Sequence, residues 1–256
     1  MYRNVIVPFD GEVETRAVLT PASDLAWRCG AKLVVVSTNA VDDQALRAAL
    51  KTQAIAKSSG EIDFWVDLER PLDVALLEAA RHRPGSIICV TSRHRQHGRR
   101  RRDTPLPAAV LGSPEVPVLL LGPDVDVTAG LPMTDVFLAI DPTPVAFRAA
   151  RLAAEWARRF RLGVHLVVVL PPGADEHAAT EPYRPLLAEV AKLAPEATLG
   201  VLHTTSPADA FVAMVDDQLN AVLLLSGPGS DGPLGVGVEA VVSRSTRPVL
   251  LAPSAP

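Results

Sequence analysis

The strongest constraint on the fold of this chain is an internal repeat. One apolar run ends in Asp10, and a second ends in Asp141, 131 positions later. The sequence Pro-Val-Leu-Leu-Leu at 117–121 returns as Pro-Val-Leu-Leu-Ala at 248–252, again 131 positions later. Equal offsets at both ends of two long segments indicate that one structural unit occurs twice. The chain is therefore expected to fold as two copies of one domain.

Each copy alternates apolar runs with helical stretches. The matching segments are 15–29 and 145–160 for a first helix, 32–36 and 165–169 for a Val-rich strand, 71–80 and 207–215 for a Pro-led helix, and 86–90 and 221–225 for a fourth strand. Strands that are apolar throughout are buried on both faces, and their alternation with helices predicts a parallel sheet covered on both sides. The expected fold class is α/β, with two tandem, doubly wound, five-stranded parallel-sheet domains.

A linker rich in Pro, Gly and Asp separates the copies at residues 122–132. We expect a first domain over 1–122 and a second over 133–256, related by a pseudo-twofold axis. The last apolar run of each copy would be an exposed sheet edge if it were left alone, and such edges promote aggregation. Pairing of these two runs, 116–121 and 248–252, within the chain would cover both edges. Assembly of two chains into a homodimer stays open.

Composition narrows the class of protein. The chain is 48% hydrophobic and 21% charged, which is typical of a globular protein. No apolar run approaches the ~20 residues of a membrane span, and the first residues lack a signal-peptide layout. Two cysteines, Cys29 and Cys89, are too few for a disulfide framework or a metal site of their own. We expect reduced thiols and a cytoplasmic protein with no membrane partner.

The order of elements, with strand-ending aspartates and closing Pro-Val-Leu-Leu runs, resembles the universal stress protein family over nearly the whole chain, twice. The resemblance implies a Rossmann-like fold of the adenine nucleotide alpha hydrolase type and a regulatory or binding role in stress response. It also implies ATP or a related adenine nucleotide as the ligand, and pairing of the runs 116–121 and 248–252 within the chain as an intramolecular pseudo-dimer. In that family the ATP motif follows the fourth strand and reads Gly, two residues, Gly, nine residues, then Gly-Ser or Gly-Thr. Small residues there let the backbone approach phosphates, and the next helix supplies N–H donors.

The first copy departs from this motif in residue type. The matching positions are Thr91, His94, Thr104 and Pro105, so the spacing is kept and the glycines are lost. Pro105 has no backbone N–H to donate to a phosphate. The first copy is therefore expected to have lost the glycine-dependent part of the site.

The second copy keeps the glycines and shortens the loop, since only five residues separate Gly229 from Gly235. The resemblance assigns the family aspartate that contacts adenosine to Asp10 and Asp141, and each could equally cap a helix. The alternative for the Gly-rich loop is a connection without a ligand, which its short length favours. The residues assigned to nucleotide binding are Asp10, Asp141, Ser226, Gly227, Gly229, Gly232 and Gly235.

A run of basic residues occupies the place of the phosphate loop in the first copy. Arginine forks bind phosphates bidentately without a close backbone approach, so this segment predicts a phosphate or other anion site. The alternative is a solvated loop. The absence of aromatic residues between the charges weighs against nucleic acid. The arginines concerned are Arg93, Arg95, Arg99, Arg100, Arg101 and Arg102.

Signatures of catalysis are missing from the sequence. The six histidines show no metal-ligand spacing, and there is neither a Walker loop nor a Gly-x-Ser-x-Gly elbow. No catalytic residue and no metal are predicted, and the chain is expected not to be an enzyme. Three hypotheses stay open: a nucleotide-binding regulatory protein, a scaffold that engages an anionic or protein partner without nucleotide, and, with least support, a nucleotide-hydrolysing enzyme with weak ATPase activity.

Overall fold

The structure is a computed structural model that describes residues 1–9, 17–39, 61–91, 110, 115–122, 125, 130–131, 133–140, 144–218, 220–226 and 236–253. The strands of the first half are β1 (Asn4–Pro8), β2 (Lys32–Ser37), β3 (Ile62–Val66), β4 (Ser86–Thr91) and β5 (Val118–Leu121). Those of the second half are β6 (Asp135–Ile140), β7 (Gly163–Leu170), β8 (Thr198–His203), β9 (Ala221–Leu225) and β10 (Val249–Leu251).

The helices lie where the repeat predicts them, within the described residues. They are α2 (Leu19–Cys29) and α4 (Leu72–Arg81) in the first half, and α6 (Pro144–Phe160), α7 (Glu176–Thr180), the 3-10 turn η2 (Glu181–Tyr183), α8 (Arg184–Ala191), α9 (Pro207–Asp216) and α10 (Val236–Arg244) in the second. Both Pro-led helices are present: Pro71 is the N-cap of α4, and Pro207 is the first residue of α9. Proline suits these positions because the first-turn N–H groups have no partner in the helix.

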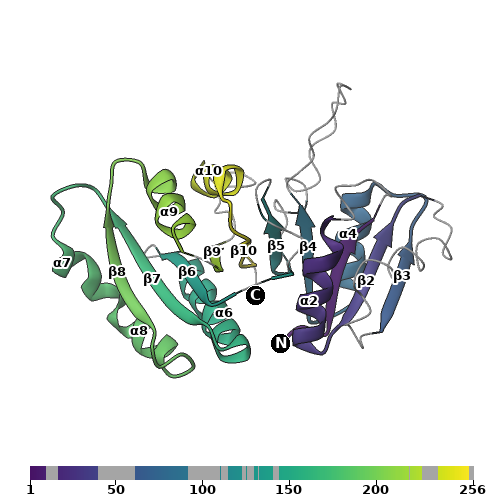
Figure 1. The fold of residues 1–256 in the computed structure, drawn as a ribbon, viewed down its shortest axis with the longest axis horizontal. Helices are drawn as coiled ribbons and strands as arrows, with labels where there is room; N and C mark the ends of the chain where they lie inside the picture. The colour runs from purple at the N-terminus through teal and green to yellow at the C-terminus, as the bar shows by residue number, and fades with distance from the viewer. Residues whose placement is uncertain are drawn as a thin grey trace.

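The described strands form one continuous ten-stranded sheet with the order β3-β2-β1-β4-β5-β10-β9-β6-β7-β8 (Figure 1). Every pair inside a half is parallel, and each half repeats the same order outward from a central first strand, β1 or β6. The predicted α/β class with two tandem five-stranded parallel half-sheets is confirmed. The two half-sheets are joined as one sheet rather than standing apart.

The junction of the halves is the pairing predicted for the last strand of each copy. β5 and β10 run antiparallel, with Leu119 opposite Leu250, and all residues of both strands are buried. Gly122, just after β5, lies so close to the second half that a Cβ on it would come 2.5 Å from the carbonyl oxygen of Ser245. Because the halves run in opposite directions, their strands have their carboxyl ends on opposite borders of the sheet.

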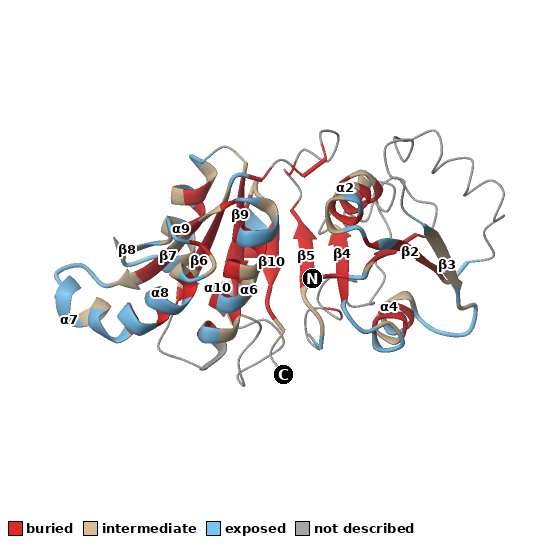
Figure 2. Ribbon diagram, turned by 90° about the horizontal axis from the view of Figure 1, so that it is seen from below, coloured by how far each residue is buried: buried red, intermediate tan, exposed pale blue. Residues whose placement is uncertain are grey.

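Helices cover both faces of the sheet, and each face has one core that crosses the junction. On one face α2, α6 and α8 pack on strand residues such as Val5 and Leu138. On the other, α4, α9 and α10 pack on residues such as Ile6 and Leu223. The buried interior runs through both halves in Figure 2. Such double coverage explains why the strands carry apolar residues on both sides.

Contacts between the halves also occur outside the sheet, where α2 approaches α6. The indole Nε1 of the fully buried Trp156 donates to Tyr2 Oη at 2.9 Å. The guanidinium of Arg159 donates to the carbonyl oxygen of Arg28 at 2.7 Å. Burial raises the pKa of the Tyr2 hydroxyl well above its usual range, so it remains a neutral partner for Trp156. The chain thus contains its own dimer-like interface.

Both cysteines of the chain lie among the described residues. Cys29 and Cys89 are both free thiols, as predicted, with Cys89 buried inside β4 and Cys29 partly buried at the end of α2. Among the helices that the structure describes, none combines the length and the apolar character that crossing a bilayer requires.

Candidate functional site

The carboxyl border of the first half-sheet has its switch point between β1 and β4. The chain leaves β1 toward β2 on one side and reaches β4 on the other, and in open α/β sheets ligands bind at such a reversal. Ile6 pairs with Ile88, so the same register continued along both strands brings Phe9 beside Thr91. The residues that follow, Asp10 on one side and the loop from residue 92 on the other, therefore leave adjacent strands.

The second half-sheet repeats this arrangement between β6 and β9 on the opposite border. Leu138 pairs with Leu224, and the register continued by two residues sets Ile140 beside Ser226. Asp141 follows Ile140 directly, and the Gly-rich segment follows Ser226. Of the residues assigned from the sequence to nucleotide binding, Ser226 is described and is half-buried at the end of β9.

The remaining sequence-derived candidates lie outside the described residues, so their assignments stay predictions. These are the two aspartates, the glycines of the second copy and the arginines of the basic run: Asp10, Asp141, Gly227, Gly229, Gly232, Gly235, Arg93, Arg95, Arg99, Arg100, Arg101 and Arg102.

Hydroxyl groups lie among the described residues at the carboxyl ends of β2, β4 and β9. Ser37, buried at the end of β2, donates its hydroxyl to the carbonyl oxygen of Asn39 and accepts from the Asn39 N–H, both at 3.3 Å. Thr91 ends β4 in the same half, and Ser226 follows β9 on the opposite border of the sheet. Burial raises the pKa of the Cys89 thiol far above its usual range, which keeps it protonated and unreactive. The hydroxyls of Thr91 and Ser226 are groups that could form hydrogen bonds with a ligand at the switch points.

One constellation of side chains was not foreseen from the sequence. On three neighbouring strands, His165 contacts Asp135 through Nε2 at 3.0 Å and Thr198 through Nδ1 at 2.9 Å, and its ring stacks on Phe137. Gly163 leaves room for the carboxylate, since a Cβ there would lie 2.3 Å from Asp135 Oδ1. These contacts tie the amino ends of β6, β7 and β8 together.

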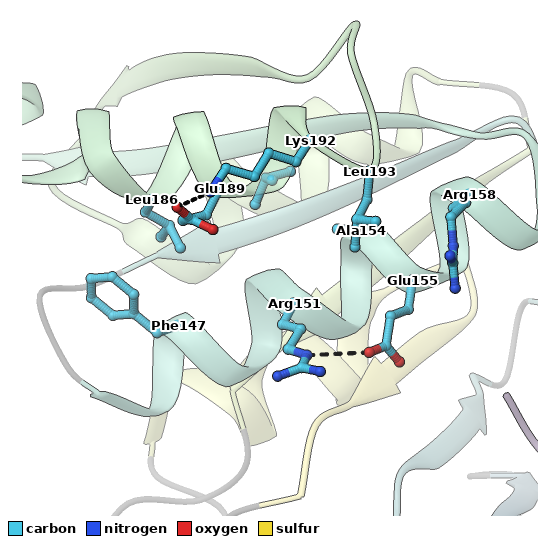
Figure 3. Close-up of a pocket in the computed structure, with 10 residues that line it drawn as sticks. Phe147, Arg151, Ala154, Glu155, Arg158, Leu186, Glu189, Lys192 and Leu193 are labelled. Carbon is cyan, nitrogen blue, oxygen red and sulfur yellow. Dashed lines mark hydrogen bonds and ion pairs between the residues drawn. The ribbon is translucent and has the colours of Figure 1, made fainter.

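Among the described residues, no group of three or more His, Cys, Asp or Glu side chains is placed to hold a metal ion. A groove of about 530 Å³ runs between α6 and α8, with Phe147, Leu186 and Leu193 along it and the Arg151–Glu155 pair on its rim (Figure 3). It lies on a helix-covered face, away from both switch points.

Comparison by sequence gives no match, either to a protein-family model or to a curated protein. Comparison by structure gives matches over nearly the full length. A universal stress protein from Archaeoglobus fulgidus DSM 4304 is 19% identical, with 98% of this chain and 96% of that chain covered and a TM-score of 0.71. A candidate universal stress protein from Pseudomonas aeruginosa UCBPP-PA14 is 16% identical, with 99% and 94% covered and a TM-score of 0.70.

A third structure, a protein of unknown function from Pseudomonas aeruginosa PAO1, is 17% identical over 99% of this chain and 93% of that chain, with a TM-score of 0.66. Identities this low describe likeness of fold. The chain therefore has the fold of the universal stress proteins, in a tandem arrangement within one polypeptide.

Proposed function

We propose that this chain is a regulatory binding protein of the universal stress type, and that it holds ATP or a related adenine nucleotide at the carboxyl border of its second half-sheet. The observation that carries the proposal is the pairing of β6 with β9. Asp141 directly follows β6 in the sequence, and the Gly-rich segment follows Ser226 at the end of β9. A carboxylate and a Gly-rich chain beside each other can contact a ribose and a phosphate respectively.

The second half is a better candidate than the first for a chemical reason. Its loop after β9 contains glycines, which allow the backbone to approach phosphate oxygens closely. The corresponding segment of the first half has lost those glycines and includes Pro105, which cannot donate an N–H. The shortened second loop should make fewer phosphate contacts than the full family motif, so we expect a modest affinity.

Isothermal titration of ATP into the wild-type chain, Asp141→Ala and Asp10→Ala tests the proposal. We expect binding by wild type and by Asp10→Ala, and an affinity at least about tenfold weaker for Asp141→Ala, as befits the loss of a hydrogen bond to a charged group. Equal affinity in all three proteins would remove the assignment of Asp141. Circular dichroism of each variant checks that the fold is retained.

A second candidate function rests on the basic run in the first copy. A chain whose phosphate loop is replaced by arginines could serve as a scaffold that engages an anionic or protein partner without nucleotide. No binding of ATP by any of the three proteins would favour this scaffold function over the first. In either case the proposed role is binding rather than catalysis, and its setting in stress response follows from the family resemblance.

A further inference from the structure

A pocket of about 590 Å³ lies where the two halves meet, on the face of the sheet that carries α2 and α6. It is built from both copies of the repeat and is separate from the switch-point borders. The N-terminus of the chain lies between α2 and α6 in Figure 1. The lining residues are Met1, Tyr2 and Cys29 from the first half and Glu155, Arg158, Arg159 and Arg161 from the second.

The charges around this junction pocket are unbalanced. Three guanidinium groups and the N-terminal ammonium face one carboxylate, Glu155, which is already paired with Arg151 at 3.3 Å (Figure 3). In the described part of the chain neither Arg158 nor Arg161 forms an ion pair with a carboxylate. Among the described lining residues, positive groups therefore outnumber negative ones, because Glu155 is the one carboxylate beside three guanidinium groups.

Contacts across the junction hold the pocket in place. Arg159 is fixed by its hydrogen bond to the carbonyl oxygen of Arg28, and Tyr2 is fixed by the donated Nε1–H of Trp156. Tyr2 and Trp156 also meet edge to face, with ring centroids 6.3 Å apart. The wall of the pocket is thus a rigid contact between two halves, which reduces the ordering that a ligand would have to impose.

Arg161 occupies a backbone position that favours glycine. It follows α6 with a backbone φ of 59°, in the left-handed region that glycine normally occupies at the end of a helix. The residue at the same place in the first copy, 131 positions earlier, is Gly30 with a φ of 65°. The second copy therefore holds a guanidinium at a position where its backbone would favour glycine.

We propose that the junction pocket binds a phosphate-class polyanion, either free pyrophosphate or the terminal phosphates of a nucleotide, and that the bound anion ties the two halves together. Guanidinium forks grip phosphate oxygens bidentately, and an anion with several charges can be shared among Arg158, Arg159 and Arg161. None of these residues belongs to the site of the proposed function, so each proposal can be tested and rejected independently of the other.

Cys29 supplies a reporter inside the pocket. It is partly buried there, whereas the second thiol, Cys89, is fully buried in β4. Burial raises the pKa of Cys29 to about 11, although the positive charges of Arg159 and the N-terminal ammonium act in the opposite direction. A bound anion should cover this thiol and slow its modification. Mass spectrometry can measure how fast a small neutral maleimide modifies Cys29. Slower modification therefore reports occupancy of this pocket and is insensitive to binding at the arginine run.

The proposal predicts that pyrophosphate protects Cys29 in the wild-type chain. Arg158→Ser should raise the half-protecting concentration about tenfold, the factor expected for loss of a charge-assisted contact. Arg161→Gly should raise it similarly while the melting temperature stays equal or increases, because glycine suits the left-handed backbone. This combination separates loss of a ligand group from loss of folding.

A matched control removes two arginines elsewhere. Arg70→Ser combined with Arg184→Ser changes net charge as much as Arg158→Ser combined with Arg161→Gly, and neither control residue lines the pocket. Pyrophosphate should still protect Cys29 in this control and in Asp141→Ala. Pyrophosphate that fails to protect Cys29, or protects it equally in Arg158→Ser and Arg161→Gly, would overturn the proposal.

ADP titrated in parallel distinguishes the source of the phosphates. Protection by ADP at lower concentration than pyrophosphate, weakened by Arg161→Gly, assigns the pocket to a nucleotide. Stronger protection by pyrophosphate assigns it to a free polyphosphate. An ADP effect that Arg161→Gly leaves unchanged contradicts the pocket as its site.

Discussion

Arg159 donates a hydrogen bond from Nη2 to the carbonyl oxygen of Arg28 at 2.7 Å, and these two residues occupy the same position in the two copies of the repeat, 131 positions apart. Residues related by the repeat that touch each other must lie close to the pseudo-twofold axis. The axis thus passes between the ends of α2 and α6 as well as between β5 and β10. The halves are joined by a sheet and by a helical contact, which makes the single chain equivalent to a dimer.

The buried hydrogen bond between Trp156 and Tyr2 should carry part of this junction. Tyr2→Phe keeps the ring and removes the acceptor, leaving the indole N–H of a fully buried tryptophan without its partner. We expect a loss of about 1–3 kcal/mol in the free energy of unfolding, measured by urea denaturation. Trp27→Phe, at an exposed tryptophan, is the control and should change stability by less than about 0.5 kcal/mol. Equal effects would show that the bond does not stabilise the junction.

The close approach at Gly122 gives a second test of the junction. Gly122→Ala would set a Cβ 2.5 Å from the Ser245 carbonyl oxygen, so the β5–β10 region would have to shift. We expect a destabilisation of about 1–3 kcal/mol, seen as a lower melting temperature. Gly200→Ala in β8, where a Cβ meets nothing within 4 Å, should be close to neutral. Equal melting temperatures for Gly122→Ala and Gly200→Ala would contradict the close approach of Gly122 to Ser245.

His203 should make stability depend on pH. Its Nδ1 lies 3.1 Å from the Pro171 carbonyl oxygen and its Nε2 lies 3.0 Å from Glu176 Oε1, and these contacts raise the pKa of His203 above its usual value. A raised pKa stabilises the fold below the unfolded-state pKa, and that contribution is lost as the pH rises through the folded-state pKa.

We expect an NMR titration to show the elevated pKa of His203 and a partial decrease in Glu176→Gln, since the Pro171 contact remains. The stability difference between wild type and His203→Gln should shrink with rising pH. A difference that grows as pH rises would contradict this arrangement.

The basic run of the first copy remains a prediction from sequence. Replacing Arg99, Arg100, Arg101 and Arg102 with serine should weaken binding of long-chain polyphosphate while the melting temperature changes little. The effect should fade with added salt, because the Debye length falls from ~10 Å at 0.1 M to ~3 Å at 1 M. Protection of Cys29 by pyrophosphate should be unchanged in the same variant. Polyphosphate binding that is indifferent to the substitution or to salt would exclude the run as a site.

Much of the fold could be predicted because its signals are local and repeated. Apolar runs such as 32–36 and 165–169 specify buried parallel strands, and the equal offsets fix the duplication. The pairing of β5 with β10 could also be expected, since each would otherwise be an open apolar edge, whereas its antiparallel direction is a finding of the structure. The positions of the switch points then follow from topology alone.

The junction pocket could not be predicted in this way. It combines Met1 with the end of α6, and these meet only after two half-sheets have paired and twisted. The contact of His165 with Asp135 likewise depends on side-chain register across strands, which an apolar pattern leaves open. One sequence signal was present: alignment of the copies sets Arg161 against Gly30, a basic residue where a helix-ending glycine is expected.

Our proposal is that adenine nucleotide binds at the switch point of the second half-sheet. Hydrogen–deuterium exchange of the full chain with and without ATP tests it most directly, because it reports protection peptide by peptide. We expect slower exchange in peptides that cover residues 138–143 and 225–237, and weaker protection of these peptides in Asp141→Ala at the same ATP concentration. Unchanged exchange in those peptides, or protection confined to residues 1–10 and 86–110 of the first half, would contradict it.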